Sequence, residues 1–140
     1  MRNVTVAVVQ MQCAKEVEAN IAKADAMVRE AAAKGAKIIL LPELFERPYF
    51  CQERQYEYYA YATPTAQNPA VQHFRAVAKE LGVVLPISFY EKAGTQLFNS
   101  IAVLDADGTL LGVYRKTHIP DDHYYCLLYT SPSPRDRSLS

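Results

Sequence analysis

The sequence predicts an α/β fold, in which a mixed sheet is covered by two helices. Short apolar, β-branched stretches alternate with segments whose apolar residues repeat at helical spacing, and the last two stretches flank an Asp-Gly turn. Alternating strands and helices followed by a hairpin are typical of a sheet that combines parallel and antiparallel strands. The strands are expected at residues 4–10, 37–41, 83–90, 97–104 and 109–114.

The two helices are predicted by apolar spacing and by their end signals. The first helix carries apolar residues at steps of three and four, at Val17, Ile21, Ala24, Val28 and Ala31. Gly35 is expected to follow its end, because glycine takes the left-handed conformation without steric cost. The second helix is expected to begin at Pro69 with Asn68 as its N-cap, and to end at Gly82.

The balance of helices and strands indicates that part of the fold is missing. Parallel strands normally have both faces covered, and two helices cannot cover both faces of a sheet of this size. We therefore expect one apolar sheet face to be bare, which favours aggregation or poor folding of the chain alone. Pro86, inside the third predicted strand, indicates a bend or an edge position there.

Composition limits the class of protein. The chain has 140 residues, 50% of them hydrophobic and 21% charged, with a formal net charge of zero, which is typical of one soluble domain or part of one. No basic patch predicts a nucleic-acid partner, and no apolar run approaches membrane-spanning length. The first residues lack a secretory signal, so we expect a cytoplasmic location. Three cysteines without CxxC spacing favour reduced thiols over disulfides or a zinc site.

Two charged residues, Glu43 and Lys116, each follow the end of a predicted strand. In an α/β sheet, strand ends can hold side chains rigidly in a crevice that substrate enters from solvent. A carboxylate and an ammonium placed there could carry chemistry, or they could form a plain ion pair. The pattern of residues alone leaves both interpretations open.

Four motifs carry a resemblance to a known family. They are the opening strand VAVVQ at 6–10, LPELF at 41–45, FNS at 98–100 and YRKTH at 114–118. In this order they resemble the N-terminal half of the nitrilase (carbon–nitrogen hydrolase) superfamily, over nearly all of residues 1–125. The resemblance implies the N-terminal part of a four-layer αββα sandwich and an amidohydrolase that uses no cofactor and no metal. A full-length parent protein of this kind is expected to be a homo-oligomer.

The resemblance also implies roles for particular residues. Glu43 matches the general base and Lys116 the oxyanion-stabilising lysine, while the nucleophilic cysteine would lie beyond the point where the chain departs from the family pattern, and is therefore absent. A second family glutamate would fall near Leu127. Cys13 and Cys51 are interpreted as ordinary buried or loop thiols. The 140-residue chain is therefore expected to be inactive by itself.

Residues 46–52 and 118–125 are most similar to family members that hydrolyse a small carbamoylated amine. Tyr49, Asp121 and His123 are candidate substrate-binding residues. The aromatic residues of segment 49–61 are interpreted first as packing or a dimer contact. A minority hypothesis, drawn from the acidic and aromatic residues that cluster in loops beside the charged pair, is that some of these rings, with Glu46 or Asp121/Asp122, bind the distal ammonium of a carbamoylated diamine. The spacing of the histidines and aspartates at 118–123 matches no metal template. Alternatives are an amidase for ureidopropionate or omega-amide substrates, and a noncatalytic binding or dimerisation fragment, although no phosphate-binding glycine loop is present.

The final residues, 126–140, break the pattern of the rest of the chain. They alternate serine and proline without helical or strand period, and 126–136 resembles the translation of a sequencing adapter. We therefore divide the chain into a partial carbon–nitrogen hydrolase domain at 1–125 and a non-native or disordered tail at 126–140. Cys126 belongs to this tail and carries no weight as a nucleophile.

Overall fold

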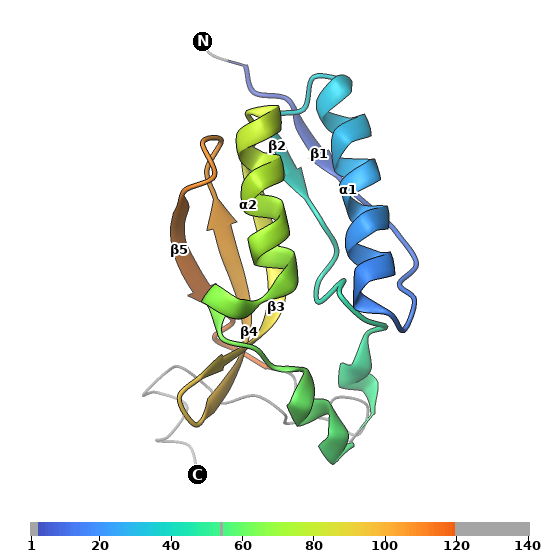
Figure 1. The fold of residues 1–140 in the computed structure, drawn as a ribbon, viewed down its shortest axis with the longest axis vertical. Coiled ribbons are helices and arrows are strands. Elements are labelled where there is room, and N and C mark those ends of the chain that lie inside the picture. The colour runs from blue at the N-terminus through green and yellow to red at the C-terminus, as the bar shows by residue number, and fades with distance from the viewer. Residues whose placement is uncertain (1–2, 54, 120–140) are drawn as a thin grey trace.

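The computed structural model describes residues 3–53 and 55–119. Its elements follow in the order β1 (Val6–Val8), α1 (Val17–Ala33), β2 (Ile38–Leu40), three short 3-10 helices at 50–52, 56–61 and 65–67, α2 (Pro69–Leu81), β3 (Leu85–Ala93), β4 (Gln96–Leu104) and β5 (Leu110–Arg115). Figure 1 shows both α-helices on one side of the strands. The α/β class and the two covering helices are thus as the sequence predicts.

The strands form two hydrogen-bonded groups that meet between β2 and β3. β1 pairs with β2 in parallel, and β3, β4 and β5 form an antiparallel meander. A parallel bridge between Ile38 and Val84 joins the two groups, with hydrogen bonds from Val84 N to Lys37 O (2.8 Å) and from Ile39 N to Val84 O (3.1 Å). The carboxyl ends of β2, β3 and β5 therefore point the same way.

Pro86 accounts for the end of the pairing between β2 and β3. In a parallel pair every second residue of a strand faces the same neighbour, so Pro86 faces β2 as Val84 does. Proline has no N–H to continue that ladder, whereas its pairing with Val103 of β4 is kept. The predicted edge position is confirmed on the β2 side of the strand, and it lets the chain after β2 diverge from β3.

The predicted helix ends are confirmed. Asn68 accepts a hydrogen bond from Val71 N at 2.9 Å, Pro69 is the first helical residue, and Gly82 ends α2 in the left-handed conformation with φ 63°. Gly35, with φ 94°, follows α1 in the same way. The turn at Gly35 reverses the chain from α1 into β2, and the turn at Gly82 reverses it from α2 into β3.

Two predicted strand ranges are wrong by two residues or more at each end, and the other three by a single residue. The first strand covers 6–8 rather than 4–10, since its only strand partner among the described residues is the short β2. β3 covers 85–93 rather than 83–90, because Gly94, with φ 62°, allows a tight hairpin that extends the pairing with β4 to Ala93 and Gln96. The sequence analysis did not identify this hairpin.

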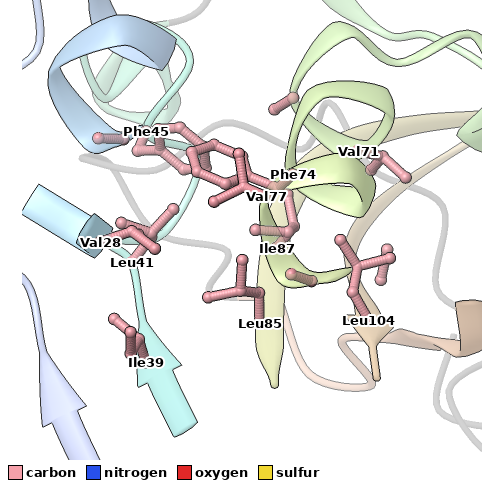
Figure 2. Close-up of a cluster of buried hydrophobic side chains, with 14 of the residues drawn as sticks. Val28, Ile39, Leu41, Phe45, Val71, Phe74, Val77, Leu85, Ile87 and Leu104 are labelled. Carbon is pink, nitrogen blue, oxygen red and sulfur yellow. The ribbon is translucent and has the colours of Figure 1, made fainter. Parts of the chain in front are cut away.

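The core lies between the helices and the strands. Side chains from both helices and from β2, β3 and β4 point toward one another there, including Val28, Ile39, Phe74, Ile87 and Leu104 (Figure 2), and each of these is fully buried. The rings of Phe45 and Phe74 meet edge to face with centroids 6.0 Å apart, linking the segment after β2 to α2. The helical apolar face predicted from sequence is therefore the core face, and it holds the segment that contains Glu43.

The opposite face of the strands is bare in the described residues. Val6, Val8, Ile38 and Leu40 alternate with the buried Ile39 and are between 37% and 77% exposed. Tyr114 of β5 is 58% exposed and lies beside Leu40 in one surface hollow. An apolar surface shared by β1, β2 and β5 is what a second layer of structure would normally cover.

We expect this bare face to bind apolar dyes. Replacing Val8 by lysine should lower the fluorescence of bound 8-anilinonaphthalene-1-sulfonate and the self-association of the chain, because Val8 is 77% exposed on that face. Tyr56→Lys is the control, since Tyr56 is 87% exposed but lies in a 3-10 helix outside the sheet. Equal effects of the two substitutions would contradict the assignment of a bare face.

We expect Gly108 to be essential for docking the β4–β5 turn on α2. A Cβ at Gly108 would lie 2.6 Å from the carbonyl oxygen of Arg75, and its φ of +84° disfavours any side chain. Gly108→Ala should lower the free energy of unfolding by about 1–3 kcal/mol in urea titrations. Gly112→Ala is the control, because nothing lies within 4 Å of a Cβ there. Equal stabilities would show that the turn does not pack as described.

Candidate active site

Glu43 and Lys116 meet at one edge of the sheet. Glu43 follows β2, Lys116 follows β5, and Lys116 Nζ lies 3.1 Å from Glu43 Oε1. The two side chains are 41% and 37% exposed, so the pair remains open to solvent. The structure thus brings the two side chains into contact at the strand ends, as the sequence predicts, whereas their chemical role stays a prediction.

A third residue, Asn99, belongs to the same group. Its side-chain Nδ2 donates to Glu43 Oε1 at 2.5 Å, and its backbone oxygen accepts from Lys116 N at 2.8 Å. The sequence analysis included Asn99 in a family motif but gave it no role in the site. The sequence feature that could have indicated its role is the alternation of side chains along β4, which places Asn99 and Ile101 on the bare face.

The backbone just after Glu43 is held in an uncommon conformation. Leu44 has φ 52°, the left-handed region that branched residues rarely adopt, and its side chain is 2% exposed. Its N–H donates to Ser88 Oγ on β3 at 3.0 Å. Burial of the side chain and this hydrogen bond together hold a turn that costs on the order of 1 kcal/mol or more. The turn fixes the backbone that directly follows Glu43.

Glu43, Asn99 and Lys116 line a hollow of about 340 Å³ on the bare face. Its other walls are Leu40, Leu41, Ser88, Ile101 and Tyr114. A carboxylate and an ammonium are thus surrounded by apolar and small polar side chains. Covering this hollow would exclude water and strengthen the electrostatic effect of both charges.

Behind the hollow, on the helix-covered face, a second ion pair holds the end of β5. Arg115 donates to both oxygens of Glu91 at 2.8 Å, and Ser100 Oγ donates to Glu91 at 2.6 Å. The Arg115 guanidinium lowers the pKa of Glu91, helped by the hydrogen bond from Ser100, while burial of the carboxyl opposes the shift. The Arg115 guanidinium also lies 4.1 Å from the centre of the Phe98 ring.

Glu46 is committed to the start of α2. Both of its carboxylate oxygens accept from Asn68 Nδ2, at 3.1 and 3.0 Å, and Ala70 N donates to it at 3.4 Å. Burial raises the pKa of Glu46, against these hydrogen bonds and the nearby Arg47. A carboxylate used in this way ties the Glu43 turn to α2, which weakens the hypothesis that Glu46 receives a substrate ammonium.

The aromatic segment forms a packed cluster beside the site. Phe50 contacts the rings of Tyr58, Tyr61 and Tyr90 with centroids 5.3–5.6 Å apart. Tyr49 lines a separate hollow with Arg47 and Tyr61, not the one that contains Glu43. Its role in substrate binding stays a prediction. Asp121 and His123, the other two predicted binding residues, lie outside the described residues.

The two described cysteines are poorly suited to nucleophilic chemistry. Cys51 is 3% exposed within the aromatic cluster, and burial raises the pKa of the Cys13 thiol, although Lys23 opposes this. A raised thiol pKa reduces the thiolate fraction at neutral pH. Among residues 3–53 and 55–119, no group of three or more histidine, cysteine or acidic side chains could hold a metal ion. No helix in the same ranges has the length and apolarity to span a membrane.

The protein is of the α/β class, with a mixed sheet that has helices on one face. It has a candidate hydrolytic site at the strand ends, where a carboxylate lies beside an ammonium. The carbon–nitrogen hydrolase family model matches residues 5–139. The chain belongs to the carbon–nitrogen hydrolase family, the nitrilase superfamily that its motifs resemble. Since the match runs past residue 125, the domain boundary expected there stays a prediction.

Relatives and solved structures agree with this assignment. The chain is 50% identical to N-carbamoylputrescine amidase of Arabidopsis thaliana over 124 residues. This match covers 89% of the chain and 42% of that protein. It is 44% identical over 121 residues to citrullinase of Francisella tularensis subsp. tularensis, covering 86% and 42%. The crystal structure of a carbon–nitrogen hydrolase from Helicobacter pylori G27 superposes with a TM-score of 0.83 at 28% identity, covering 94% of this chain and 45% of that one. The chain thus spans less than half the length of these relatives.

We expect Glu91 to stabilise the fold only above acidic pH. Its pKa is lowered below the ordinary value of 4.5, so its contribution is present above that value and is lost as pH falls through the folded-state pKa. Glu91→Gln should lower the free energy of unfolding at pH 7 by about 2 kcal/mol, since it removes the charge of a buried carboxyl that pairs with the partly exposed Arg115. Urea titrations from pH 7 to pH 3 should show this gap shrinking below pH 4.5.

Glu30→Gln provides the control for this experiment. Glu30 pairs with Lys34 on the exposed surface of α1, where ion pairs contribute little to stability. It should therefore change unfolding much less than Glu91→Gln. A gap between wild type and Glu91→Gln that stays constant down to pH 3 would show that the Arg115 pair does not stabilise the fold.

Proposed function

We propose that this chain is the N-terminal part of an amidohydrolase that releases putrescine, ammonia and carbon dioxide from N-carbamoylputrescine. In the full-length protein a cysteine outside the 140 residues is the nucleophile. Glu43 is the general base and Lys116 stabilises the oxyanion. The 140-residue chain carries the two charged groups without that cysteine, so it is inactive by itself.

The chemistry follows from the properties of these groups. Glu43 accepts the thiol proton, the thiolate attacks the carbamoyl carbon, and the Lys116 ammonium faces the negative oxygen that forms. Collapse expels ammonia, which takes the proton back from Glu43, and leaves the thiol-bound carbamoyl group. Glu43 then takes a proton from water as the water attacks this carbon. The sulfur leaves and takes that proton from Glu43, which restores the thiol and the carboxylate, and the carbamic acid that is released decomposes to carbon dioxide and the amine.

The contact between Glu43 and Lys116 is the observation that carries this proposal. An ion pair that only stabilised the fold would not require a hollow open to solvent, and exposed pairs contribute little to stability. The 50% identity to N-carbamoylputrescine amidase of Arabidopsis thaliana supports the particular substrate. The whole reaction also depends on residues that this chain does not contain.

A second candidate substrate is citrulline, favoured by the 44% identity to a citrullinase. Both compounds carry a terminal ureido group, so the same site chemistry would serve either one. They differ at the other end, where one has an ammonium and the other an amino acid. The relative kcat/KM of the full-length protein for these two compounds, with ammonia release as the readout, decides between them. An amidase for ureidopropionate or omega-amide substrates stays an alternative, as does a noncatalytic dimerisation fragment, which would be supported if the 140-residue chain itself were found in cells.

We further propose that residues 1–125 are the hydrolase part and that 126–140 is a non-native tail. The Ser/Pro alternation and the adapter-like stretch support this division. Resequencing the gene across the codons for Tyr125 and Cys126 tests it. Continued coding sequence of the family would support the proposal, whereas an unchanged reading frame with a translated peptide spanning these residues would contradict it.

We expect substitutions of the charged pair to abolish or strongly reduce hydrolysis by the full-length protein. Lys116→Met should lower kcat by roughly a hundred- to a thousandfold, because one oxyanion-stabilising group is lost. Glu43→Gln should lower it at least as much, because the thiol then lacks its base. Ammonia release from N-carbamoylputrescine is the measurement.

Lys34→Met is the matched control for the charge. Lys34 also pairs with a glutamate, Glu30, but on the surface of α1, so its removal should leave kcat within about threefold. If Lys116→Met were as active as Lys34→Met, the oxyanion role would be refuted. Thiol-dependent ammonia release by the 140-residue chain would refute the proposed inactivity.

A further inference from the structure

Asn99 contacts both members of the charged pair. Its backbone oxygen accepts from the N–H of Lys116 at 2.8 Å, and its side-chain nitrogen donates to Glu43 Oε1 at 2.5 Å. An ionised carboxylate can only accept hydrogen bonds, so the amide must present its nitrogen to it. A single residue thus fixes the separation of the two charged groups.

The contacts also distinguish the two oxygens of Glu43. Asn99 Nδ2 and Lys116 Nζ both lie against Oε1, at 2.5 and 3.1 Å. Within residues 3–53 and 55–119, no hydrogen bond is made to Oε2. Two donors on one oxygen oppose rotation of the carboxylate, and they leave the second oxygen as the available proton acceptor.

Asn99 is well placed to hold this geometry. It is 6% exposed and lies in β4, the middle strand of the meander, paired with Tyr90 of β3 on one side and bonded to Lys116 on the other. The next residue, Ser100, points to the opposite face and donates to Glu91. A donor on a central strand is positioned more precisely than one on a loop.

We propose that Asn99 is a positioning residue that reserves Oε1 of Glu43 for the lysine side and leaves Oε2 to accept the proton of the nucleophile. The proposal rests on the proposed function. An amide is suited to this role because it orients the carboxylate without adding charge and without competing for the proton. Lys116 alone could not do so, since an ammonium on a flexible four-carbon chain can contact either oxygen.

The kinetic test compares two substitutions of Asn99 and one control, Ser100→Ala, in the full-length protein. The substrate is whichever amide or ureido compound the wild type hydrolyses. Asn99→Asp keeps the size of the side chain but removes the donor, and Asn99→Ala removes the side chain. Both should lower kcat by about ten- to a hundredfold with KM within about threefold, because substrate binding does not need the amide whereas proton transfer needs the oriented carboxylate.

Ser100→Ala is the matched control. It also removes a hydrogen bond from a buried carboxylate, one residue along the same strand, but on the other face. It should lower the melting temperature about as much as Asn99→Ala and leave kcat within about threefold. If Asn99→Asp retained the kcat of Ser100→Ala, or if its loss lay in KM alone, Asn99 would have no positioning role.

A second measurement reads the contact without any substrate. In the ¹⁵N-labelled full-length protein, Glu43→Ala should shift the side-chain amide resonances of Asn99 and speed their exchange with water, while Glu30→Ala should leave them unchanged. Unmoved Asn99 resonances in Glu43→Ala would overturn the inference, even for a protein that hydrolyses N-carbamoylputrescine. A shifted amide in a protein that does not hydrolyse that compound would instead count against the proposed substrate.

Discussion

The structure depends on the convergence of three strands at one edge of the sheet, where Glu43 Oε1 receives hydrogen bonds from both Asn99 and Lys116. These residues lie as far as 73 positions apart in the sequence. They meet because β2, β3 and β5 run in the same direction and β4 lies between β3 and β5. Any change that alters the register of these strands would separate the charged groups.

The surrounding structure holds this convergence from the side that the helices cover. Phe45, two residues after Glu43, is fully buried against Phe74 of α2, and Glu46 binds the N-terminal end of the same helix. Between them, Leu44 is kept in its left-handed conformation with the help of Ser88. The core, the helix cap and one strained residue therefore determine together where a carboxylate faces the open side of the sheet.

The sequence predicted the parts of this arrangement that follow from local chemistry. Asn68 and Pro69 marked the start of α2, glycines marked two helix ends, and strand ends pointed to Glu43 and Lys116. It did not predict the β3–β4 hairpin or the contact of Asn99 with Glu43, because both depend on which strands are neighbours. Leu44 gave no signal either, since nothing about a leucine indicates a positive φ that only tertiary packing imposes.

The proposed mechanism requires a cysteine outside the 140 residues that approaches the charged pair from the bare side of the sheet, opposite α1 and α2. The crystal structure of the full-length protein is the most direct measurement. We expect a cysteine Sγ within hydrogen-bonding distance of Glu43 Oε2, beside Lys116 and beneath a second layer that covers Val8 and Leu40. A structure in which no cysteine approaches Glu43 and Lys116 would contradict the assignment of this edge as a hydrolase site.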